Sequence, residues 1–366
     1  MTKRTLKKVA ETVAETRNEK VELPPITKPN WDFVVTTGST RLDLIISGGR
    51  LRYGGIPCGI MVEFFGSPGG GKTALLASIA AAVQRMKGTA RIYDPEGRLD
   101  DEYSKFYGLD LKKCAKYSRP DTVREIFDNG ILKWNTYGDP DKTPSMIGCD
   151  GAAALSTEME MGGEDKMSMK RAKDFRTGCR KSARIISGKN KLLVWTNQLI
   201  DNVGAIGYAP KTITPGGHAI PFFSSLRCRV TQIQKLSNEK TLGAIRKSMG
   251  IDAKSDAKIS NIYAIRSHIK VEKSSVDEPF RECDITLRFN YGIDDIRDNL
   301  EYLKYIMGNE DYNFFKMGNR GWGTISSACK SVEDAGLEKE LKDKVVDVWN
   351  QVNKSFKEER KPRVFV

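Results

Sequence analysis

A glycine-rich segment of eight residues constrains the fold of this chain more than any other feature of the sequence. Between residues 66 and 73 it matches the phosphate-binding P-loop pattern in full. Its residues are Gly66, Ser67, Pro68, Gly69, Gly70, Gly71, Lys72 and Thr73. The apolar run Val62–Phe65 precedes the motif and the small-residue run Ala74–Val83 follows it, which is the strand–loop–helix context that such a motif requires. The chain is therefore predicted to bind a nucleoside triphosphate in an α/β domain.

Each chemical group of a P-loop site has a candidate in the sequence. The glycines let backbone N–H groups crowd around the phosphates. Lys72 would neutralise the β- and γ-phosphates, and Thr73 would ligate magnesium. Asp150, at the end of a short apolar run, is the candidate for the second magnesium ligand; the alternative is an aspartate that opens a turn with Gly151. Glu96 is the candidate for activating water, and the alternative is a solvated loop glutamate.

Short apolar runs alternate with longer helical stretches from about residue 31 to residue 291. The runs are Ile60–Phe65, Ala90–Tyr93, Ser145–Cys149, Leu192–Thr196 and Leu226–Ile233. This alternation predicts a largely parallel sheet, whose carboxyl edge would bring Glu96 close to the phosphates. Two later segments, Ile259–Lys273 and Cys283–Phe289, alternate more strictly and are expected to add antiparallel strands at one edge.

The two ends of the chain depart from this pattern. Leu6, Val9 and Val13 recur at helical spacing, and Pro24 and Pro25 then break the helix. A short helix with a narrow apolar stripe cannot bury itself alone, so it docks on its own core or on a neighbouring subunit. The chain beyond the predicted sheet is charged and helical. We therefore expect an N-terminal arm for oligomerisation over residues 1–30, a nucleotide-binding core over 31–296 and a small α-rich C-terminal lobe over 297–366.

The charge balance favours a polyanionic partner. The sequence has 60 Lys and Arg against 47 Asp and Glu, a net charge of +13. Clustered basic side chains release counterions from phosphate backbones, although a generally basic protein has the same composition. Composition alone leaves nucleic acid and an anionic membrane surface open. No run reaches the roughly 18 apolar residues of a membrane helix, and the basic N-terminus lacks the apolar stretch of a secretory signal.

The seven cysteines are dispersed and form no CxxC pair, which argues against a zinc site. An odd, scattered set in a chain of this size predicts reduced thiols in a cytosol-like compartment.

Several segments outside the P-loop resemble those of the RecA family of bacterial and phage strand-exchange recombinases, with the phage UvsX proteins as the nearer type. The spacing agrees from about residue 33 to residue 293. The segments are Thr37–Asp43, Asp94–Asp100 followed by Tyr103, Thr196–Gln198, Thr214–Ala219 and the step Glu272–Ser274.

This resemblance implies roles for individual residues. Glu96 would be the hydrolytic base, Tyr103 would stack on adenine with Asp100 nearby, and Gln198 would sense the γ-phosphate and couple the nucleotide to DNA. The family places two lysines where they reach the ATP of the next subunit, and Lys273 is the one matching cation here. The cofactors implied are ATP and Mg²⁺.

The resemblance also implies an assembly. It predicts a RecA-like P-loop core, an N-terminal helix docked on the neighbouring core, and a helical homo-oligomeric filament on single-stranded DNA. The filament would pair with homologous duplex DNA and promote strand exchange with DNA-stimulated ATP hydrolysis. No membrane partner is implied, mediator proteins are not identified, and the location implied is the bacterial cytoplasm, or the infected host cell for a phage protein.

The first segment expected to face DNA is the loop Glu158–Ser168 and the helix Met169–Ile186 that follows it. Lys173, Arg176 and Arg180 recur at spacings of three and four, so they share one basic face of that helix. Contact with phosphates is one interpretation, and a solvated helix face is the other.

The second segment expected to face DNA is the long loop Leu199–Pro215. Apolar tips between glycines could stack on bases or wedge between them; the alternative is a surface loop that packs its own side chains. The candidate DNA-binding residues of this segment and the glycines after it are Val203, Ile206, Tyr208, Lys211, Gly216 and Gly217.

The chain departs from the family pattern in four places. Gly151 stands where a serine usually follows the magnesium aspartate, and Gly69 and Gly70 make the P-loop unusually flexible. Ser275 stands where the second of the two lysines is expected. The C-terminus is not acidic, which puts the family's self-inhibition of DNA access in doubt.

Two other classes share this ATPase core. A ring-forming replicative helicase needs an additional N-terminal domain, for which about thirty residues are too few. A signalling ATPase of the same fold that binds no DNA would not need the basic helix face or the long glycine-rich loop. Electron microscopy with ATP and single-stranded DNA would separate filament, ring and neither.

Overall fold

The computed structural model describes residues 27–158, 168–201, 212–215, 217–251, 255–311 and 324–356. The N-terminal helix, most of the first DNA-facing loop and the C-terminal tail lie outside the described residues. So do five of the candidate DNA-binding residues, which are Val203, Ile206, Tyr208, Lys211 and Gly216.

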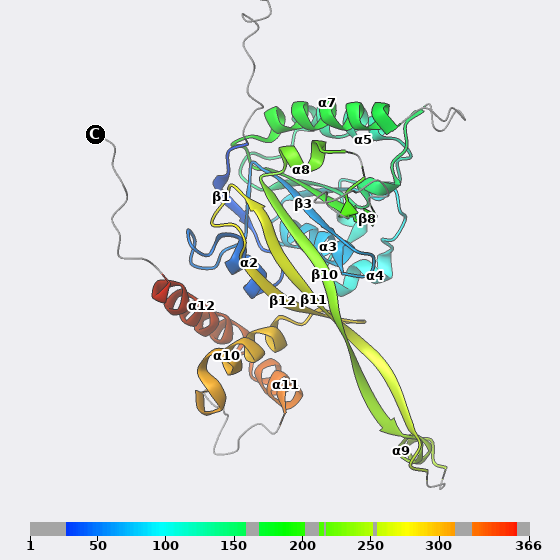
Figure 1. The fold of residues 1–366 in the computed structure, drawn as a ribbon, viewed down its shortest axis with the longest axis vertical. Helices are drawn as coiled ribbons and strands as arrows, with labels where there is room; N and C mark the ends of the chain where they lie inside the picture. The colour runs from blue at the N-terminus through cyan, green and yellow to red at the C-terminus, as the bar shows by residue number, and fades with distance from the viewer. Residues whose placement is uncertain are drawn as a thin grey trace, which may run out of the picture.

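Within these ranges, a nine-stranded sheet forms the centre of the molecule, in the order β13-β12-β11-β10-β3-β7-β6-β4-β5 (Figure 1). The strands are β3 Met61–Gly66, β4 Thr89–Tyr93, β5 Lys116–Ser118, β6 Ser145–Cys149, β7 Lys191–Gln198, β10 Leu226–Thr241, β11 Lys258–Ser274, β12 Glu282–Arg288 and β13 Gly292–Ile293. Neighbours from β10 to β5 run parallel. The pairs β10–β11, β11–β12 and β12–β13 are antiparallel. The predicted parallel sheet and its antiparallel additions at one edge are both confirmed.

Helices and short strands surround this sheet. In the core the helices are α2 Thr40–Ser47, α3 Lys72–Arg85, α4 Asp101–Phe106, α5 Val123–Asn129, α7 Ser168–Ile186, α8 Ala219–Phe223, η1 Leu111–Lys113, η2 Ile131–Thr136 and η3 Ala152–Ala154. Two small antiparallel pairs complete the core, namely β1 Asn30–Val35 with β2 Ile56–Cys58 and β8 Ile200–Asp201 with β9 Thr212–Ile213.

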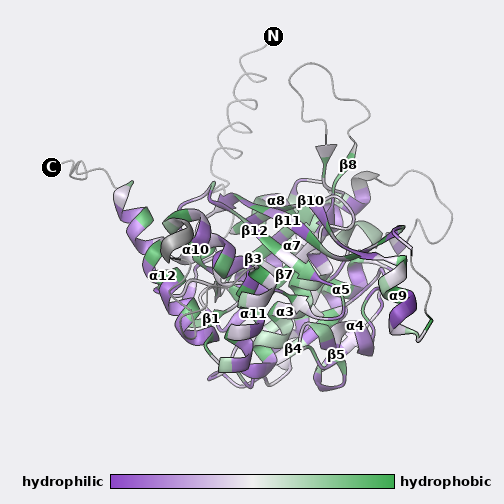
Figure 2. Ribbon diagram, turned by 90° about the horizontal axis from the view of Figure 1, so that it is seen from below, coloured by the Kyte–Doolittle hydropathy of each residue, from purple (hydrophilic) through white to green (hydrophobic). Residues whose placement is uncertain are grey.

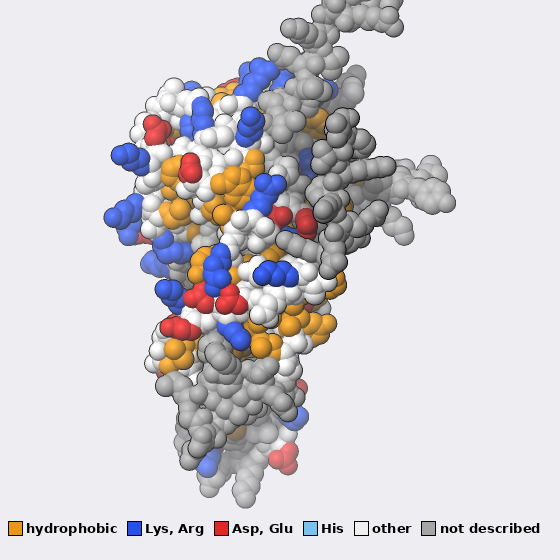
Figure 3. Space-filling model, turned by 90° about the vertical axis from the view of Figure 1, so that its left-hand side faces the viewer, with side chains coloured by type: hydrophobic (Ala, Val, Ile, Leu, Met, Phe, Trp, Pro, Cys, Tyr) orange, Lys and Arg blue, Asp and Glu red, His pale blue; other side chains and the backbone are white. Residues whose placement is uncertain are grey.

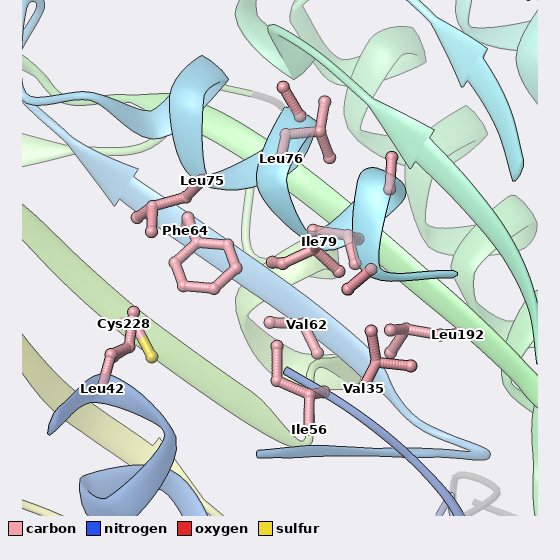
Figure 4. Close-up of a cluster of buried hydrophobic side chains, with 14 of the residues drawn as sticks. Val35, Leu42, Ile56, Val62, Phe64, Leu75, Leu76, Ile79, Leu192 and Cys228 are labelled. Atoms are coloured by element: carbon pink, nitrogen blue, oxygen red, sulfur yellow. The ribbon is translucent and has the colours of Figure 1, made fainter. Parts of the chain in front are cut away.

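Both faces of the sheet are buried because side chains alternate along its strands. In β3, Val62 and Phe64 join the cluster under α3, whereas Met61 joins the cluster under α5 and α7. In β7, Leu192 belongs to the cluster under α3, and its neighbour Leu193 belongs to the cluster under α5 and α7. Figure 4 shows Phe64 of β3 beside Leu75 and Ile79 of α3. A three-layer α/β core therefore holds the carboxyl ends of the strands in fixed positions.

The strands β10 and β11 continue well past the sheet as a two-stranded ribbon that ends at α9 Leu242–Ser248 (Figure 1). The sequence-based prediction for the first of these strands ended at Ile233, whereas β10 runs to Thr241. The residues in between are mostly polar, so they show no alternation that would predict a strand. Backbone pairing with β11 extends β10 without help from burial.

The last three helices, α10 Asp295–Asp311, α11 Ile325–Ala335 and α12 Glu338–Ser355, form their own apolar cluster. Leu44 of α2 belongs to that cluster and joins it to the core. The carboxylate of Asp295 accepts hydrogen bonds from the backbone N–H and the hydroxyl of Thr40 at 2.6 and 2.7 Å. Figure 2 shows hydrophilic residues along α12 and apolar ones in the central strands. The boundary between core and lobe after residue 296 stays a prediction.

Basic side chains are spread over the surface. On the face drawn in Figure 3, Lys and Arg lie among apolar and acidic side chains and do not gather into one patch. Among the helices of the described ranges, none has the length and apolarity that crossing a bilayer would need. The seven cysteines are free thiols in this structure.

Candidate functional site

A pocket of about 350 Å³ opens at the carboxyl edge of the parallel strands. The P-loop, the segment after β4 and the ends of β6 and β7 form one side, and β11 and β12 form the other. Its lining residues are Gly69, Gly71, Lys72, Thr73, Ala74, Glu96, Arg98, Tyr103, Tyr107, Asp150, Thr196, Gln198, Ile265, Leu287 and Phe289. The sheet topology thus brings together the P-loop and the three side chains predicted to serve it, Glu96, Asp150 and Gln198.

The P-loop has the backbone that phosphate binding requires. Gly71, the residue before α3, has φ +90, and a Cβ at this position would lie 2.0 Å from a methyl carbon of Leu287. Only glycine fits both constraints without strain. The Lys72 ammonium donates to the carbonyl oxygens of Gly66 and Ser67 at 3.0 and 2.8 Å. Burial lowers the pKa of Lys72, and the nearby carboxylates of Asp150 and Glu96 oppose this shift.

Asp150 and Thr73 are suited to a magnesium ion. One carboxylate oxygen of Asp150 accepts the Thr196 hydroxyl at 2.6 Å, and the other is buried without a hydrogen-bond partner among the described residues. Burial raises the pKa of Asp150 to about 6, although the nearby hydroxyls of Thr196 and Thr73 oppose this shift. No group of three or more His, Cys, Asp or Glu within the described ranges could hold a metal by itself. Mg²⁺ fits such a site because it takes one or two protein ligands and fills its shell with phosphate oxygens and water.

Two side chains hold the carboxylate of Glu96, and a third residue packs closely against it. The Gln198 amide donates to one carboxylate oxygen at 2.8 Å, and Arg98 pairs with the other at 2.5 Å. A Cβ at Gly151 would lie 2.4 Å from the Glu96 side chain, and Gly151 itself has φ +90. The departure at Gly151 therefore has a local physical reason, because the Glu96 carboxylate occupies the space that a serine side chain would need.

Two tyrosines of the α4 region form one wall of the pocket. The rings of Tyr103 and Tyr107 lie 5.1 Å apart, and burial raises the pKa of Tyr103. Asp100 does not line the pocket. Its carboxylate accepts the backbone N–H groups of Glu102 and Tyr103 at 2.9 and 2.7 Å, so it fixes the start of the helix that carries Tyr103.

Sequence reasoning missed several lining residues. Tyr107 lies four residues after Tyr103, a spacing that places two helical residues on one face and could have identified it. Ile265, Leu287 and Phe289 come from the antiparallel strands on the other side of the pocket, and no local pattern connects them to a P-loop.

A buried carboxylate, Glu63, lies next to the P-loop in β3 and has no exposed surface. It accepts hydrogen bonds from Arg227 of β10 at 2.6 Å and from the Asn197 amide of β7 at 3.1 Å. The same amide donates to the carbonyl of Pro215 at 3.3 Å, where the second DNA-facing loop ends. Burial raises the pKa of Glu63, and Arg227 opposes the shift. Glu63 therefore joins three strands, and the Asn197 amide extends this set of hydrogen bonds to the loop end.

Lys273 lies at the end of β11, away from the pocket of its own chain. Its ammonium donates to the carbonyls of Pro221 and Phe222 at 3.0 and 2.7 Å, at the end of α8. Burial lowers its pKa, and the charge of Arg227 adds to this shift. The Ser275 backbone N–H and hydroxyl both approach the Ser225 carbonyl, at 2.8 and 3.3 Å.

The described part of the region predicted to face DNA contains the predicted helix. Lys173, Arg176 and Arg180 are exposed on α7, whereas Phe175 and Cys179 on its other face are fully buried. The two short strands β8 and β9 close the base of the second loop. Just after this loop, Gly217 has φ +73, and a Cβ there would lie 3.2 Å from Ala172 of α7. The loop base and the basic helix are therefore neighbours.

Comparisons with known proteins cover this whole region. The family model of the RecA N-terminal domain matches residues 27–294. Protein RecA of Thermus aquaticus is 33% identical over 270 residues, which are 72% of this chain and 69% of that protein. Protein RecA of Acholeplasma laidlawii is 30% identical over 263 residues, 71% of this chain and 69% of that protein. Protein RecA of Borrelia hermsii is 28% identical over 330 residues, 88% of this chain and 84% of that protein.

Proposed function

This chain belongs to the RecA family, and we propose that it binds and hydrolyses ATP in the pocket between the P-loop and β12. As a member of that family it is an ATP-dependent recombinase with DNA-dependent ATPase activity. It forms filaments on single-stranded DNA and pairs them with homologous duplex DNA.

The observation that carries the site assignment is the bonding of Glu96. Gln198 and Glu96 share a hydrogen bond of 2.8 Å in the same pocket as Lys72 and Thr73. A carboxylate in this place can accept a proton from water, and an amide beside it can respond to the γ-phosphate. A single pocket thus contains a phosphate clamp, a base and a sensor.

The geometry of the pocket supports a role for each remaining residue. Lys72 would neutralise the β- and γ-phosphates. Thr73 and Asp150 would hold the magnesium ion, which offsets charge that develops on the phosphates when it is bound. Tyr103, with Tyr107 beside it, would provide the surface on which adenine stacks, and Asp100 would position Tyr103 through the helix cap.

We also propose the division into parts that the sequence suggested. Residues 1–30 would form an oligomerisation arm, 31–296 the ATPase core with both DNA-binding loops, and 297–366 the C-terminal lobe. Single-stranded DNA would contact the basic face of α7 and the second loop, because the helix and the base of that loop are adjacent. The loop residues Val203, Ile206, Tyr208 and Lys211, with Gly216 and Gly217 after them, would support base stacking.

Replacing Arg176 and Arg180 together by glutamine is expected to weaken binding of single-stranded DNA and to flatten its salt dependence. Each lost phosphate contact reduces the slope of log K against log salt by about 0.7 for a single strand, so the slope should fall by about 1.4. Fluorescence anisotropy with a labelled oligonucleotide at several salt concentrations measures both quantities.

The double variant Lys112→Gln, Lys142→Gln is the matched control, because it removes the same number of charges from exposed positions elsewhere. A slope equal to that of the unaltered protein in the Arg176 and Arg180 variant would show that this helix face does not contact phosphates.

We propose that Lys273 stabilises the transferred phosphoryl group of the ATP held by the next subunit. Lys273→Ala is expected to lower DNA-stimulated turnover by about 100-fold or more, as loss of a transition-state donor does, with little change in ATP affinity. Ser275→Ala should stay within about threefold of the unaltered protein, because serine offers only a neutral hydrogen bond. Steady-state ATPase assays with saturating single-stranded DNA compare the two variants.

The two carbonyl contacts of Lys273 suggest a structural role as well, so thermal unfolding and the ATP affinity of each variant are the controls. Near-normal turnover in both variants would contradict the assignment and direct attention to Arg266 and Lys270 on the same strand.

A further inference from the structure

Arg98 is a cation in the ATP pocket whose presence the P-loop chemistry does not explain. It lies two residues after Glu96, in the segment between β4 and α4, and its side chain is 49% exposed. Its Nε lies 2.5 Å from Oε2 of Glu96. The charged side chains of the pocket lining are two cations, Lys72 and Arg98, and two carboxylates, Glu96 and Asp150. Among the described residues of this lining, Arg98 is therefore the one cation besides the P-loop lysine.

The backbone around Arg98 is held in place. Gly97, just before it, has φ +65, a conformation in which a residue with a side chain would be strained. The Gly97 N–H donates to the carbonyl of Asp94 at 3.1 Å, and the Leu99 N–H donates to the Asp94 carboxylate at 2.9 Å. Leu99 itself is buried. The turn on either side of Arg98 is therefore fixed, and its long, half-exposed side chain is the part that can adjust to a ligand.

The guanidinium of Arg98 has N–H groups that no described residue uses. An arginine side chain carries five N–H donors in a planar fork. Within the described ranges, Glu96 is the ion-pair partner of Arg98, and the terminal nitrogens Nη1 and Nη2 donate no hydrogen bond. The fork matches the geometry of phosphate oxygens, which it can bind in pairs. Arg98 can therefore bind a phosphate without losing its contact with Glu96.

The contact with Glu96 relates Arg98 to the γ-phosphate in particular. The water that Glu96 would activate has to lie within hydrogen-bond reach of this carboxylate and about 3 to 3.5 Å from the γ-phosphorus. The oxygens of that phosphoryl group must then lie close to a guanidinium that contacts the same carboxylate. Burial lowers the pKa of Lys72, and the nearby charge of Arg98 adds to this shift. The two cations therefore act on one region of the pocket.

The ion pair does not prevent Glu96 from acting as a base. An ionised carboxylate has about four lone-pair sites, and Gln198 and Arg98 approach one oxygen each, so a water molecule can still donate to Glu96. In the hydrolysis step the water oxygen bonds to the γ-phosphorus, and the water proton passes to Glu96. The bond from that phosphorus to the β–γ bridging oxygen breaks, and its electron pair leaves with ADP. Arg98 keeps its protons and would offset the charge that develops on the phosphoryl oxygens.

We propose that Arg98 is a further catalytic residue, which binds the γ-phosphate of ATP through its terminal nitrogens while its Nε stays beside Glu96. This cation comes from the chain that carries the P-loop, whereas Lys273 is proposed to reach the ATP of the next subunit. The proposal rests on the proposed function, because it takes Glu96 as the base in this pocket. In the alternative, Arg98 only positions the Glu96 carboxylate and does not touch the nucleotide.

The test compares Arg98→Gln and Arg98→Lys with the unaltered protein. Displacement of a fluorescent nucleotide by ADP and by a non-hydrolysable ATP analogue gives both affinities. In Arg98→Gln the affinity for the ATP analogue should fall about tenfold, as loss of a charge-assisted hydrogen bond does, while that for ADP changes little because ADP lacks the γ-phosphate. Turnover with saturating single-stranded DNA should fall by about 100-fold. Arg98→Lys keeps the charge but not the fork, so its turnover should be intermediate.

Arg119→Gln is the matched control. Arg119 is an exposed arginine beside the same turn, since a Cβ at Gly97 would lie 3.3 Å from its guanidinium, and it is not part of the pocket lining. Its turnover and both nucleotide affinities should equal those of the unaltered protein. Thermal unfolding of Arg98→Gln should be close to normal, because an ion pair of a half-exposed arginine contributes little to stability.

Equal effects of Arg98→Gln on the two nucleotide affinities would overturn the proposal, because Arg98 would then not recognise the γ-phosphate. A loss of turnover with such an unchanged affinity ratio would show the positioning role instead. Near-normal turnover in Arg98→Gln would also overturn the proposal. Failure of the proposed function gives a different result. Normal turnover in Glu96→Gln would show that Glu96 is not the base, whereas the affinity ratio is measured without hydrolysis and does not depend on that assignment.

Discussion

Glu96→Gln is expected to lower DNA-stimulated ATP turnover by about 10² to 10⁴-fold while ATP still binds. Glutamine keeps the size of the side chain and can still accept the hydrogen bond from Gln198, so the pocket should retain its shape. It cannot accept a proton from water at neutral pH, so the rate of the chemical step should fall while ATP affinity stays the same. Turnover is measured with saturating single-stranded DNA, and binding is measured with a fluorescent ATP analogue.

The matched control is Glu102→Gln, which makes the same chemical change at an exposed position on α4. Its turnover should equal that of the unaltered protein. Undiminished hydrolysis in the Glu96 variant would show that this residue is not the base. The next candidate would then be Asp94, because one of its carboxylate oxygens is buried without a hydrogen-bond partner among the described residues.

Lys72→Ala is expected to abolish productive ATP binding, with affinity at least 100-fold weaker and no measurable DNA-stimulated turnover. The ammonium group lies against the Gly66 and Ser67 carbonyls, where a triphosphate would replace those contacts with charge-assisted ones. Alanine leaves the phosphates without a cation in a partly buried site. Titration of a fluorescent ATP analogue gives the affinity directly.

A lysine-to-alanine change at exposed Lys105 serves as the control and should leave ATP affinity unchanged. Thermal unfolding of the Lys72 variant should also be close to normal, because the lysine has no ion pair in the described structure that its loss would break. ATP affinity within a few-fold of normal would mean that the glycine-rich backbone alone holds the phosphates.

Much of the fold was predictable because the sheet is buried on both faces. The runs Ser145–Cys149 and Leu192–Thr196 are mostly apolar, so both are predicted as strands, and β6 coincides with the first of them. The outer half of β10 was not predictable from pattern, since its polar residues bury nothing. Backbone hydrogen bonds hold this part of β10 in place, and a pattern of side chains in the sequence gives no sign of them.

The candidate site divides in the same way. The sequence predicts that the strands before Lys72, Thr73 and Asp150 run parallel. These three side chains were therefore expected to lie at the same edge of the sheet. Phe289 and Leu287 enter the pocket from β12 and its end, and their position depends on how the antiparallel strands curve over the P-loop. The reason for Gly151 was also invisible in the sequence, because it depends on where the Glu96 side chain lies.

Glu63 has a thermodynamic consequence. One carboxylate joins the strand that leads into the P-loop to β10 and to the strand that ends in Gln198, and the Asn197 amide that it accepts also bonds to Pro215, at the end of the second loop. A displacement of Pro215 on DNA binding would therefore also move Asn197. The side chain of Asn197 in turn accepts the backbone N–H of Gln198 at 3.0 Å. Two ligands coupled through one rigid set of bonds must affect each other equally in free energy. If ATP binding raises the affinity of this chain for DNA by some factor, DNA binding must raise its affinity for ATP by the same factor.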